Sequence, residues 1–197
     1  MKKSLKSVVA LAALAVVSLL SGCMPDPVVF SEVFQLGVGE KLYTKYNIWY
    51  TDPSDISCLN IQQGAFIPVG TEIEPLGTDF WLNKIRFRDT AGKEYAIRFN
   101  DGYRICAMHD YIAYTFTKTP PEELFAGIPE KSLSRIRRGE VVQGMNQHEV
   151  LLAYGPPPAA RTPDLRNETW IYWITESETV RLVFRDDTVR QILNINR

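Results

Sequence analysis

The sequence predicts an α+β protein with a β-rich N-terminal domain followed by a smaller domain of short helices and three strands. Three observations predict this class. Short apolar runs alternate with turn residues over 41–118, start and stop signals frame a single short helix over 146–155, and strand-like alternation returns over 169–195. Apolar residues make up 45% of the chain and aromatic residues 11%, a balance typical of a globular protein.

The first 22 residues have the three parts of a secretory signal peptide. Lys2, Lys3 and Lys6 precede an apolar run over 8–20, and small residues follow it. The run is shorter than the roughly 20 apolar residues that a membrane span needs. We therefore expect residues 1–22 to be removed and a mature chain of residues 23–197 to remain.

The segment Leu20-Ser21-Gly22-Cys23 resembles the lipobox of bacterial lipoproteins. The resemblance implies that the chain is cut before Cys23, which then carries acyl chains that anchor it in a membrane. Met24 follows Cys23, and by resemblance to enterobacterial sorting this favours the outer membrane, facing the periplasm, over retention in the inner membrane. An ordinary secretory peptide with a chance cysteine is the alternative.

Charge and cysteine content restrict the partners and the redox state. The chain has 22 Lys+Arg and 23 Asp+Glu, and loss of the three signal lysines leaves 19 against 23, with no basic stripe for nucleic acid. Cys58 and Cys106 remain besides Cys23, and a disulfide between them in an oxidising periplasm could stabilise the fold by about 3–4 kcal/mol. Two buried thiols are the alternative.

The N-terminal half reads as a tether followed by strands. Pro25 and Pro27 predict an irregular lipidated tether over 23–40. Residues 41–118 predict a small barrel or sandwich, with a hairpin over 80–99 and one long or two short strands over 103–118. The stretch "QQGAFIPVGTEIEPLG" loosely resembles bacterial SH3-like domains. Residues 119–138 predict a linker with one helical turn, which begins at Pro120 or Pro121.

The stretch "GMNQHEVLLAYGPPP" predicts a helix of about eight residues with well-defined ends. Asn146 and Glu149 have the spacing of a capping box. Gly155 suits the left-handed position after a helix, and the prolines at 156–158 prevent its continuation. So short a helix is marginal alone, and we expect it to pack against neighbouring strands.

Residues 169–195 predict three antiparallel strands. In "TWIYWIT", Trp170 and Tyr172 share one face and Trp173 lies on the other. Residues 179–195 read as two strands joined by a turn at Asp186-Asp187.

The order of "GMNQHEV", "YGPPP", "WIYW" and "VRLVFRDDTV" resembles the outer-membrane lipoprotein family typified by BamE, also called SmpA or OmlA. The likeness covers about residues 139–195 and implies two helices packed on a three-stranded antiparallel sheet, within a domain over 139–197. It also implies outer-membrane barrel-assembly components as partners. Typical members are shorter and lack a β-rich domain between the lipid and the motif.

The sequence offers little for catalysis. Its two histidines, His109 and His148, lie far apart, and no metal-binding, nucleophile or phosphate-loop motif is present. We therefore expect no enzyme activity, no metal and no cofactor.

These observations predict a binding or scaffold module in outer-membrane assembly or maintenance. The candidate partner surface combines the open face of the C-terminal sheet with the loop over 156–168. Its residues are Pro157, Arg161, Trp170, Tyr172 and Trp173. An inhibitor of an envelope hydrolase and a cell-wall-binding module are the alternatives.

Overall fold

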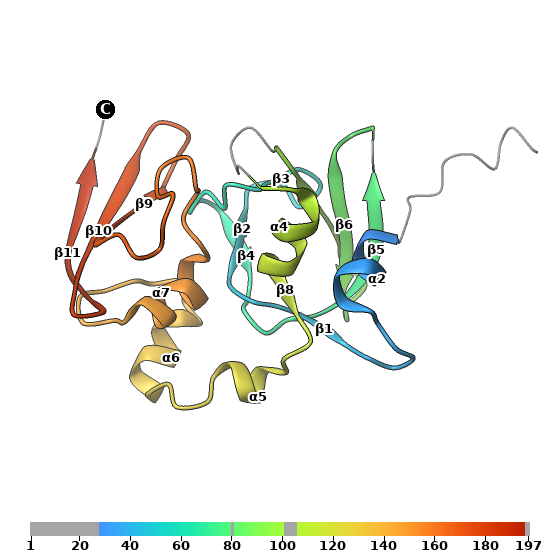
Figure 1. The fold of residues 1–197 in the computed structure, drawn as a ribbon, viewed down its shortest axis with the longest axis horizontal. Helices are drawn as coiled ribbons and strands as arrows, with labels where there is room; N and C mark the ends of the chain where they lie inside the picture. Colours follow the sequence, from blue (N-terminus) through green and yellow to red (C-terminus); the bar gives the residue numbers. More distant parts are fainter. Residues whose placement is uncertain (1–27, 80, 101–105, 196–197) are drawn as a thin grey trace, which may run out of the picture.

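The computed structural model describes residues 28–79, 81–100 and 106–195 and shows the expected α+β class. A curled, mixed six-stranded sheet and a two-stranded sheet form the N-terminal half, and a three-stranded sheet with short helices forms the C-terminal half (Figure 1). The predicted signal peptide and Cys23 lie outside the described residues.

The first described element corrects the predicted tether. Residues Val28–Phe34 form helix α2, and Phe30 is buried with its ring centroid 5.5 Å from that of Phe116. Val33 and Phe34 pack against the same core, so the apolar positions repeat at the spacing of one helix face. The prediction of irregular structure over 23–40 is therefore wrong for this helix.

Strands of the N-terminal half pair in the order β3-β7-β6-β5-β1-β8, and β2 pairs with β4. The contact between β3 and β7 is parallel and the others are antiparallel. Several of these strands have only two or three residues. The strands are β1 Leu42–Thr44, β2 Ile48–Tyr50, β3 Ile56–Ser57, β4 Ala65–Ile67, β5 Glu72–Asp79, β6 Lys84–Asp89, β7 Glu94–Arg98 and β8 Phe116–Thr117.

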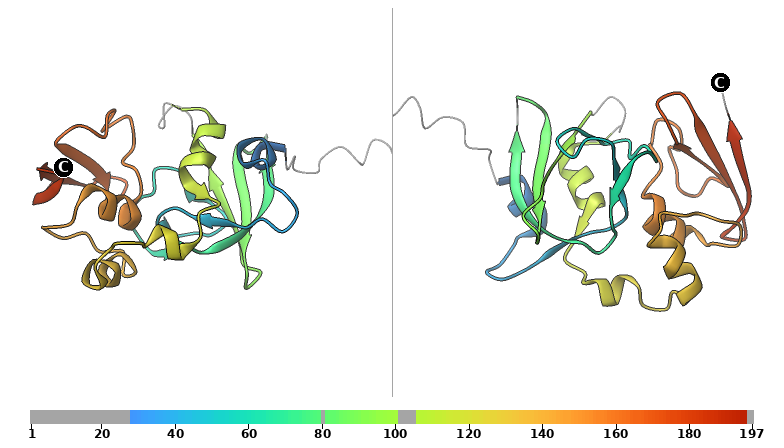
Figure 2. Two further views of the ribbon diagram at one scale, coloured as in Figure 1. Left: turned by 60° about the horizontal axis from the view of Figure 1, so that its bottom comes forward. Right: turned by 180° about the vertical axis from the view of Figure 1, so that it is seen from behind.

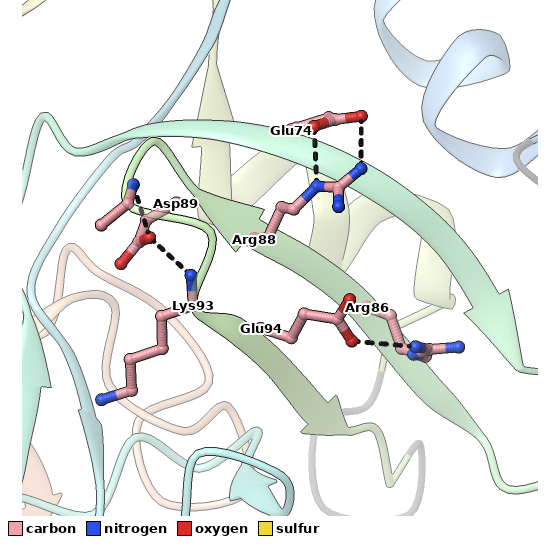
Figure 3. Close-up of polar contacts among 7 residues, drawn as sticks. Glu74, Arg86, Arg88, Asp89, Lys93 and Glu94 are labelled. Atoms are coloured by element: carbon pink, nitrogen blue, oxygen red, sulfur yellow. Dashed lines mark hydrogen bonds and ion pairs between the residues drawn. The ribbon is translucent and has the colours of Figure 1, made fainter.

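The predicted hairpin over 80–99 is confirmed by β6 and β7, which place Phe87 opposite Tyr95. The carboxylate of Asp89 holds the turn by accepting the backbone N–H groups of Ala91 and Lys93 at 3.0 and 2.9 Å (Figure 3). Alternate residues such as Ile85 and Phe87 are buried on the inner face.

The outer face of this sheet is covered by ion pairs. Arg88 donates to Glu74 across β5 and β6 at 2.7 and 3.0 Å, and Arg86 reaches Glu94 across β6 and β7 at 3.2 Å (Figure 3). Such exposed pairs mark a solvated surface, so the core of this half lies on the opposite face of the sheet.

Residues 103–118 were expected to be strand, and that prediction is wrong for most of the segment. Met108–Thr115 form helix α4, and only Phe116–Thr117 continue as β8. Tyr111, Ile112 and Thr115 are buried at helical spacing against the core. A short apolar run fits a helix and a strand almost equally well, so tertiary packing decides between them.

Three helices lead into the C-terminal half. They are α5 Pro121–Leu124, α6 Glu130–Ile136 and α7 Gln147–Tyr154. The capping box of α7 is confirmed, because Asn146 accepts the Glu149 N–H at 2.9 Å and Glu149 accepts the Asn146 N–H at 3.0 Å. The expected helical turn begins at Pro121. The prediction of a linker with one turn over 119–138 is wrong for α6, because Leu133 and Ile136 of this second helix are buried.

The C-terminal sheet has the order β11-β10-β9, with β9 over Thr169–Trp173, β10 over Thr179–Arg185 and β11 over Thr188–Ile195. Asp186 and Asp187 both have positive φ, as a two-residue type I′ hairpin turn requires. A β-bulge between Val183 and Phe184 shifts the pairing, so Phe184 lies opposite Val189. Trp170 and Tyr172 pack with residues of α6, α7 and β10 in a second core.

Asn47 joins the two halves through buried hydrogen bonds. Its side-chain amide donates to the carbonyl oxygens of Ile136 at 2.7 Å and Ala153 at 3.1 Å, and its side-chain oxygen accepts the Val69 N–H at 2.8 Å. Its own backbone N–H donates to the Leu152 carbonyl oxygen at 3.1 Å. Asn47 thereby satisfies polar groups of α6, α7 and the N-terminal half at once.

Asn60 completes the same junction. It donates to the carbonyl oxygens of Asn47 at 3.1 Å and Tyr154 at 2.8 Å, and it accepts the Trp49 N–H at 2.8 Å. We refer to Asn47 and Asn60 together as the asparagine junction. Because both side chains are buried, they fix how the two halves meet.

Gly155 ends α7 where the two halves are closest. Its φ of 74° and ψ of −178° suit glycine, and a Cβ there would lie 2.6 Å from Cδ2 of Tyr46. The role of the abrupt helix end is therefore to let α7 approach the N-terminal half closely. The Gly155 carbonyl also accepts the Tyr172 hydroxyl at 2.9 Å.

We expect Asn47→Ala to lower the free energy of unfolding by about 3 kcal/mol or more, because buried carbonyl and N–H groups lose their partner. Urea unfolding followed by circular dichroism measures the change. Asn167→Ala, at an exposed position, is the control and should change stability little. Equal stability of both variants would contradict the structural role of Asn47.

Gly155→Ala should destabilise more than Gly144→Ala. Both glycines have positive φ, so each substitution carries backbone strain of about 1–3 kcal/mol, but a Cβ at Gly144 would meet no atom within 4 Å. The difference in thermal unfolding between the two variants isolates the clash with Tyr46. Equal losses would show that the close approach at Gly155 contributes nothing.

Candidate binding groove

An apolar groove of about 510 Å³ lies between the two halves of the molecule. Tyr46, Tyr111 and Tyr114 form its N-terminal wall, while α7 and the segment after it form the C-terminal wall. Figure 1 shows α4 on the N-terminal half and α7 on the C-terminal half. A concave, mostly apolar surface at a domain junction is a common place for ligand and peptide binding.

Hydrogen bonds fix the N-terminal wall. The Tyr46 hydroxyl lies 3.0 Å from the Thr115 hydroxyl, which donates to the Tyr111 carbonyl at 2.7 Å. This chain holds Tyr46 and α4 together, so the wall is formed before any ligand binds.

Lys45 and His148 are the basic residues that line the groove, and its described lining residues include no carboxylate. The Lys45 ammonium donates to the Ala113 carbonyl at 2.9 Å, in the last turn of α4, where a cation offsets the negative end of the helix dipole. Burial lowers the pKa of Lys45. His148 is exposed on α7, as its place in the capped first turn predicts.

The loop over 156–168 forms the other wall and is held to β9. The Thr162 hydroxyl accepts the Ile171 N–H at 3.0 Å, and the Trp170 indole donates to the Leu165 carbonyl at 3.1 Å. Asp164 and Arg166 form a short ion pair next to these contacts. Pro156, Pro157 and Pro163 therefore line the groove from a fixed backbone.

The structure separates the predicted partner residues into two groups. Pro157 lines the groove, and Arg161 lies over the half-buried Trp173 ring at 5.0 Å from its centroid. Trp170 and Tyr172 are fully buried, so placing them on the open sheet face was wrong. Their face of β9 turns toward the helices, because that face must be covered to form a core.

Sequence reasoning missed the N-terminal wall of the groove. Tyr114 is 59% exposed on α4, and Leu165 is 41% exposed on the facing loop. Neither residue belongs to a motif, and their proximity depends on how the two halves meet. The one available signal was Tyr114. If residues 108–115 are placed on a helix, its ring lies outside the face that packs into the core.

Cys58 and Cys106 are in the thiol form in this structure, in keeping with the alternative to the predicted disulfide. Cys58 is buried, and its sulfur accepts the Asn100 N–H at 3.3 Å. Cys106 is half-buried, packs at the border of the N-terminal core and lines the groove.

The described residues hold no cluster of three or more His, Cys, Asp and Glu side chains that could bind a metal ion. His109 lies 3.5 Å from Asp110, and both side chains are more than half exposed. In the part of the chain that the structure describes, no helix combines the length and apolarity required to cross a membrane.

Comparison with known proteins gives no match to a family model, to a curated protein or to a solved structure. The resemblance to the BamE family therefore stays a prediction. The description of the groove rests on the structure of this chain alone.

The pKa of Asp164 tests its ion pair with Arg166 in the loop over 156–168. The Arg166 side chain, helped by its backbone N–H, lowers the pKa of Asp164 from 3.8 to about 2. The pair thus contributes to stability above pH 3.8, and the contribution is lost as the pH falls through about 2. In Arg166→Ala, NMR titration of the Asp164 carboxyl should show a pKa closer to 3.8, whereas Arg161→Ala should leave it unchanged. An unchanged pKa in Arg166→Ala would disprove the ion pair.

Proposed function

We propose that this protein is a lipid-anchored outer-membrane lipoprotein that faces the periplasm and binds an envelope protein through the groove. It acts as a non-enzymatic binding or scaffold module in outer-membrane assembly or maintenance. The observation that carries the proposal is the groove itself, which has firmly held apolar walls on both halves of the chain.

The composition of the groove favours a protein segment as ligand. Tyrosine and proline rings present large apolar areas that lose little side-chain entropy on binding, as is common at protein interfaces. Tyr114 and Leu165 remain exposed on opposite walls, where a bound segment could cover both. The volume of about 510 Å³ suits a few side chains of a partner, not a whole domain.

The envelope location rests on the signal peptide, the lipobox and the resemblance to the BamE family. Helix α7 and the three antiparallel strands lie within the residues that the resemblance covers, and α6, the second helix of this core, lies before them. We accordingly interpret the C-terminal half as BamE-like and the N-terminal half as a small barrel of SH3-like type. Barrel-assembly components are the first partners to test.

Crosslinking in intact cells followed by purification tests the groove. In Tyr114→Ser/Leu165→Ser, recovery of the partner should fall about tenfold or more, because an exposed apolar contact is lost on each wall of the groove. Leu193→Ser, which removes an exposed leucine from β11, should retain the partner. Circular dichroism should show that all three proteins are folded.

The identity of the recovered material distinguishes the alternatives. A barrel-assembly or other membrane protein supports the proposal, while a hydrolase or co-sedimentation with the cell wall would support the two alternatives. Equal recovery by the groove variant and the Leu193 control would contradict the groove as the binding site. Cys23→Ser tests separately whether anchoring is needed for capture.

A further inference from the structure

Two of the most exposed apolar side chains of the described residues lie side by side in the sequence. Trp81 is 83% exposed and Leu82 is 62% exposed, in the turn that joins β5 to β6. Hairpin turns usually carry polar residues, so a Trp-Leu pair at this position needs an explanation.

Hydrogen bonds hold the backbone of Leu82 and Asn83, and the side chains of Trp81 and Leu82 are exposed. Asp79 accepts the Leu82 N–H at 2.9 Å, and the Asn83 side chain donates to the Phe99 carbonyl at 2.6 Å. The Phe99 N–H in turn donates to the Asn83 carbonyl at 2.8 Å. These bonds tie the turn to the end of β7 and oppose collapse of Trp81 and Leu82 onto the sheet.

The chain approaches the fold at the same end of the molecule. Helix α2 packs against β5 and begins at Val28, only five residues after Cys23. Figure 1 and the rear view in Figure 2 both show α2 and the β5–β6 turn at the end opposite β9, β10 and β11. Five extended residues reach at most about 17 Å, so an acyl anchor at Cys23 would keep this end near the membrane.

We propose that the β5–β6 turn is a membrane contact, in which Trp81 and Leu82 enter the headgroup region of the bilayer that holds Cys23. This inference rests on the acylation of Cys23 in the proposed function. Tryptophan favours the membrane–water interface, where its apolar ring and its indole N–H are both accommodated.

A bilayer fits this pair better than a protein partner does. Two side chains are far fewer than the roughly 20–30 residues a side of a stable protein interface. A surface that is already tethered nearby needs little extra affinity, because the anchor raises the effective concentration of the turn at the membrane. The contact would fix the orientation of the fold, with the C-terminal half and the groove held away from the lipid.

Tryptophan quenching tests the contact. The full protein, as it is recovered from cells, is reconstituted in phosphatidylethanolamine and phosphatidylglycerol vesicles with brominated acyl chains. Emission of the wild type should be quenched, and the Trp81 component, obtained by difference from Trp81→Phe, should fall about twofold. Leu82→Ser should weaken the quenching, whereas Trp173→Phe, which removes a tryptophan from the C-terminal sheet, should retain it.

Mass spectrometry of the same samples distinguishes failure of the membrane contact from failure of the proposed function. An acylated Cys23 together with an unquenched Trp81 would overturn the membrane contact and leave the proposed function standing. An unacylated Cys23 would overturn both. Quenching that persists in Trp81→Phe would show that another tryptophan reaches the lipid and would also overturn the assignment.

Discussion

Asn47 is the residue on which the arrangement of the two halves depends. A buried amide with one acceptor and two donors is costly unless each finds a partner, and here each partner comes from a different segment. Two independent apolar cores could slide against each other. Directional bonds to Ile136, Ala153 and Val69 select one relative position, and Val69 itself packs in the C-terminal core.

This constraint creates the groove as a consequence. The junction brings α7 against the N-terminal half, Gly155 permits the close approach to Tyr46, and the space left between α4 and the loop over 156–168 becomes the groove. A binding surface shared by two halves keeps its shape only if the halves do not move. Preorganisation of this kind lowers the entropy lost when a partner binds.

Sequence patterns predicted those elements whose structure depends on residues close together in the chain. The Asn146 capping box, the hairpin over 80–99 and the shared face of Trp170 and Tyr172 all follow from spacing along the chain. Which face of β9 is buried did not follow, because alternation shows only that one of the two faces is covered. The helix over 108–115 was not predicted, because a short apolar run becomes a helix or a strand according to what it packs against. The N-terminal wall of the groove was beyond prediction for a similar reason, since Tyr46 and Tyr114 line it with the loop only once the two halves have met through long-range contacts such as the bonds of Asn47 and Asn60.

Native-state hydrogen exchange tests the central claim that the asparagine junction makes one rigid body. The Asn47 N–H donates across the junction to the Leu152 carbonyl, and the Val69 N–H donates to the Asn47 side chain within the junction. The account predicts that they exchange only with global unfolding, at the same free energy as core amides of Ile85 and Leu182. Exchange of the junction amides through an opening that leaves both cores protected would contradict it.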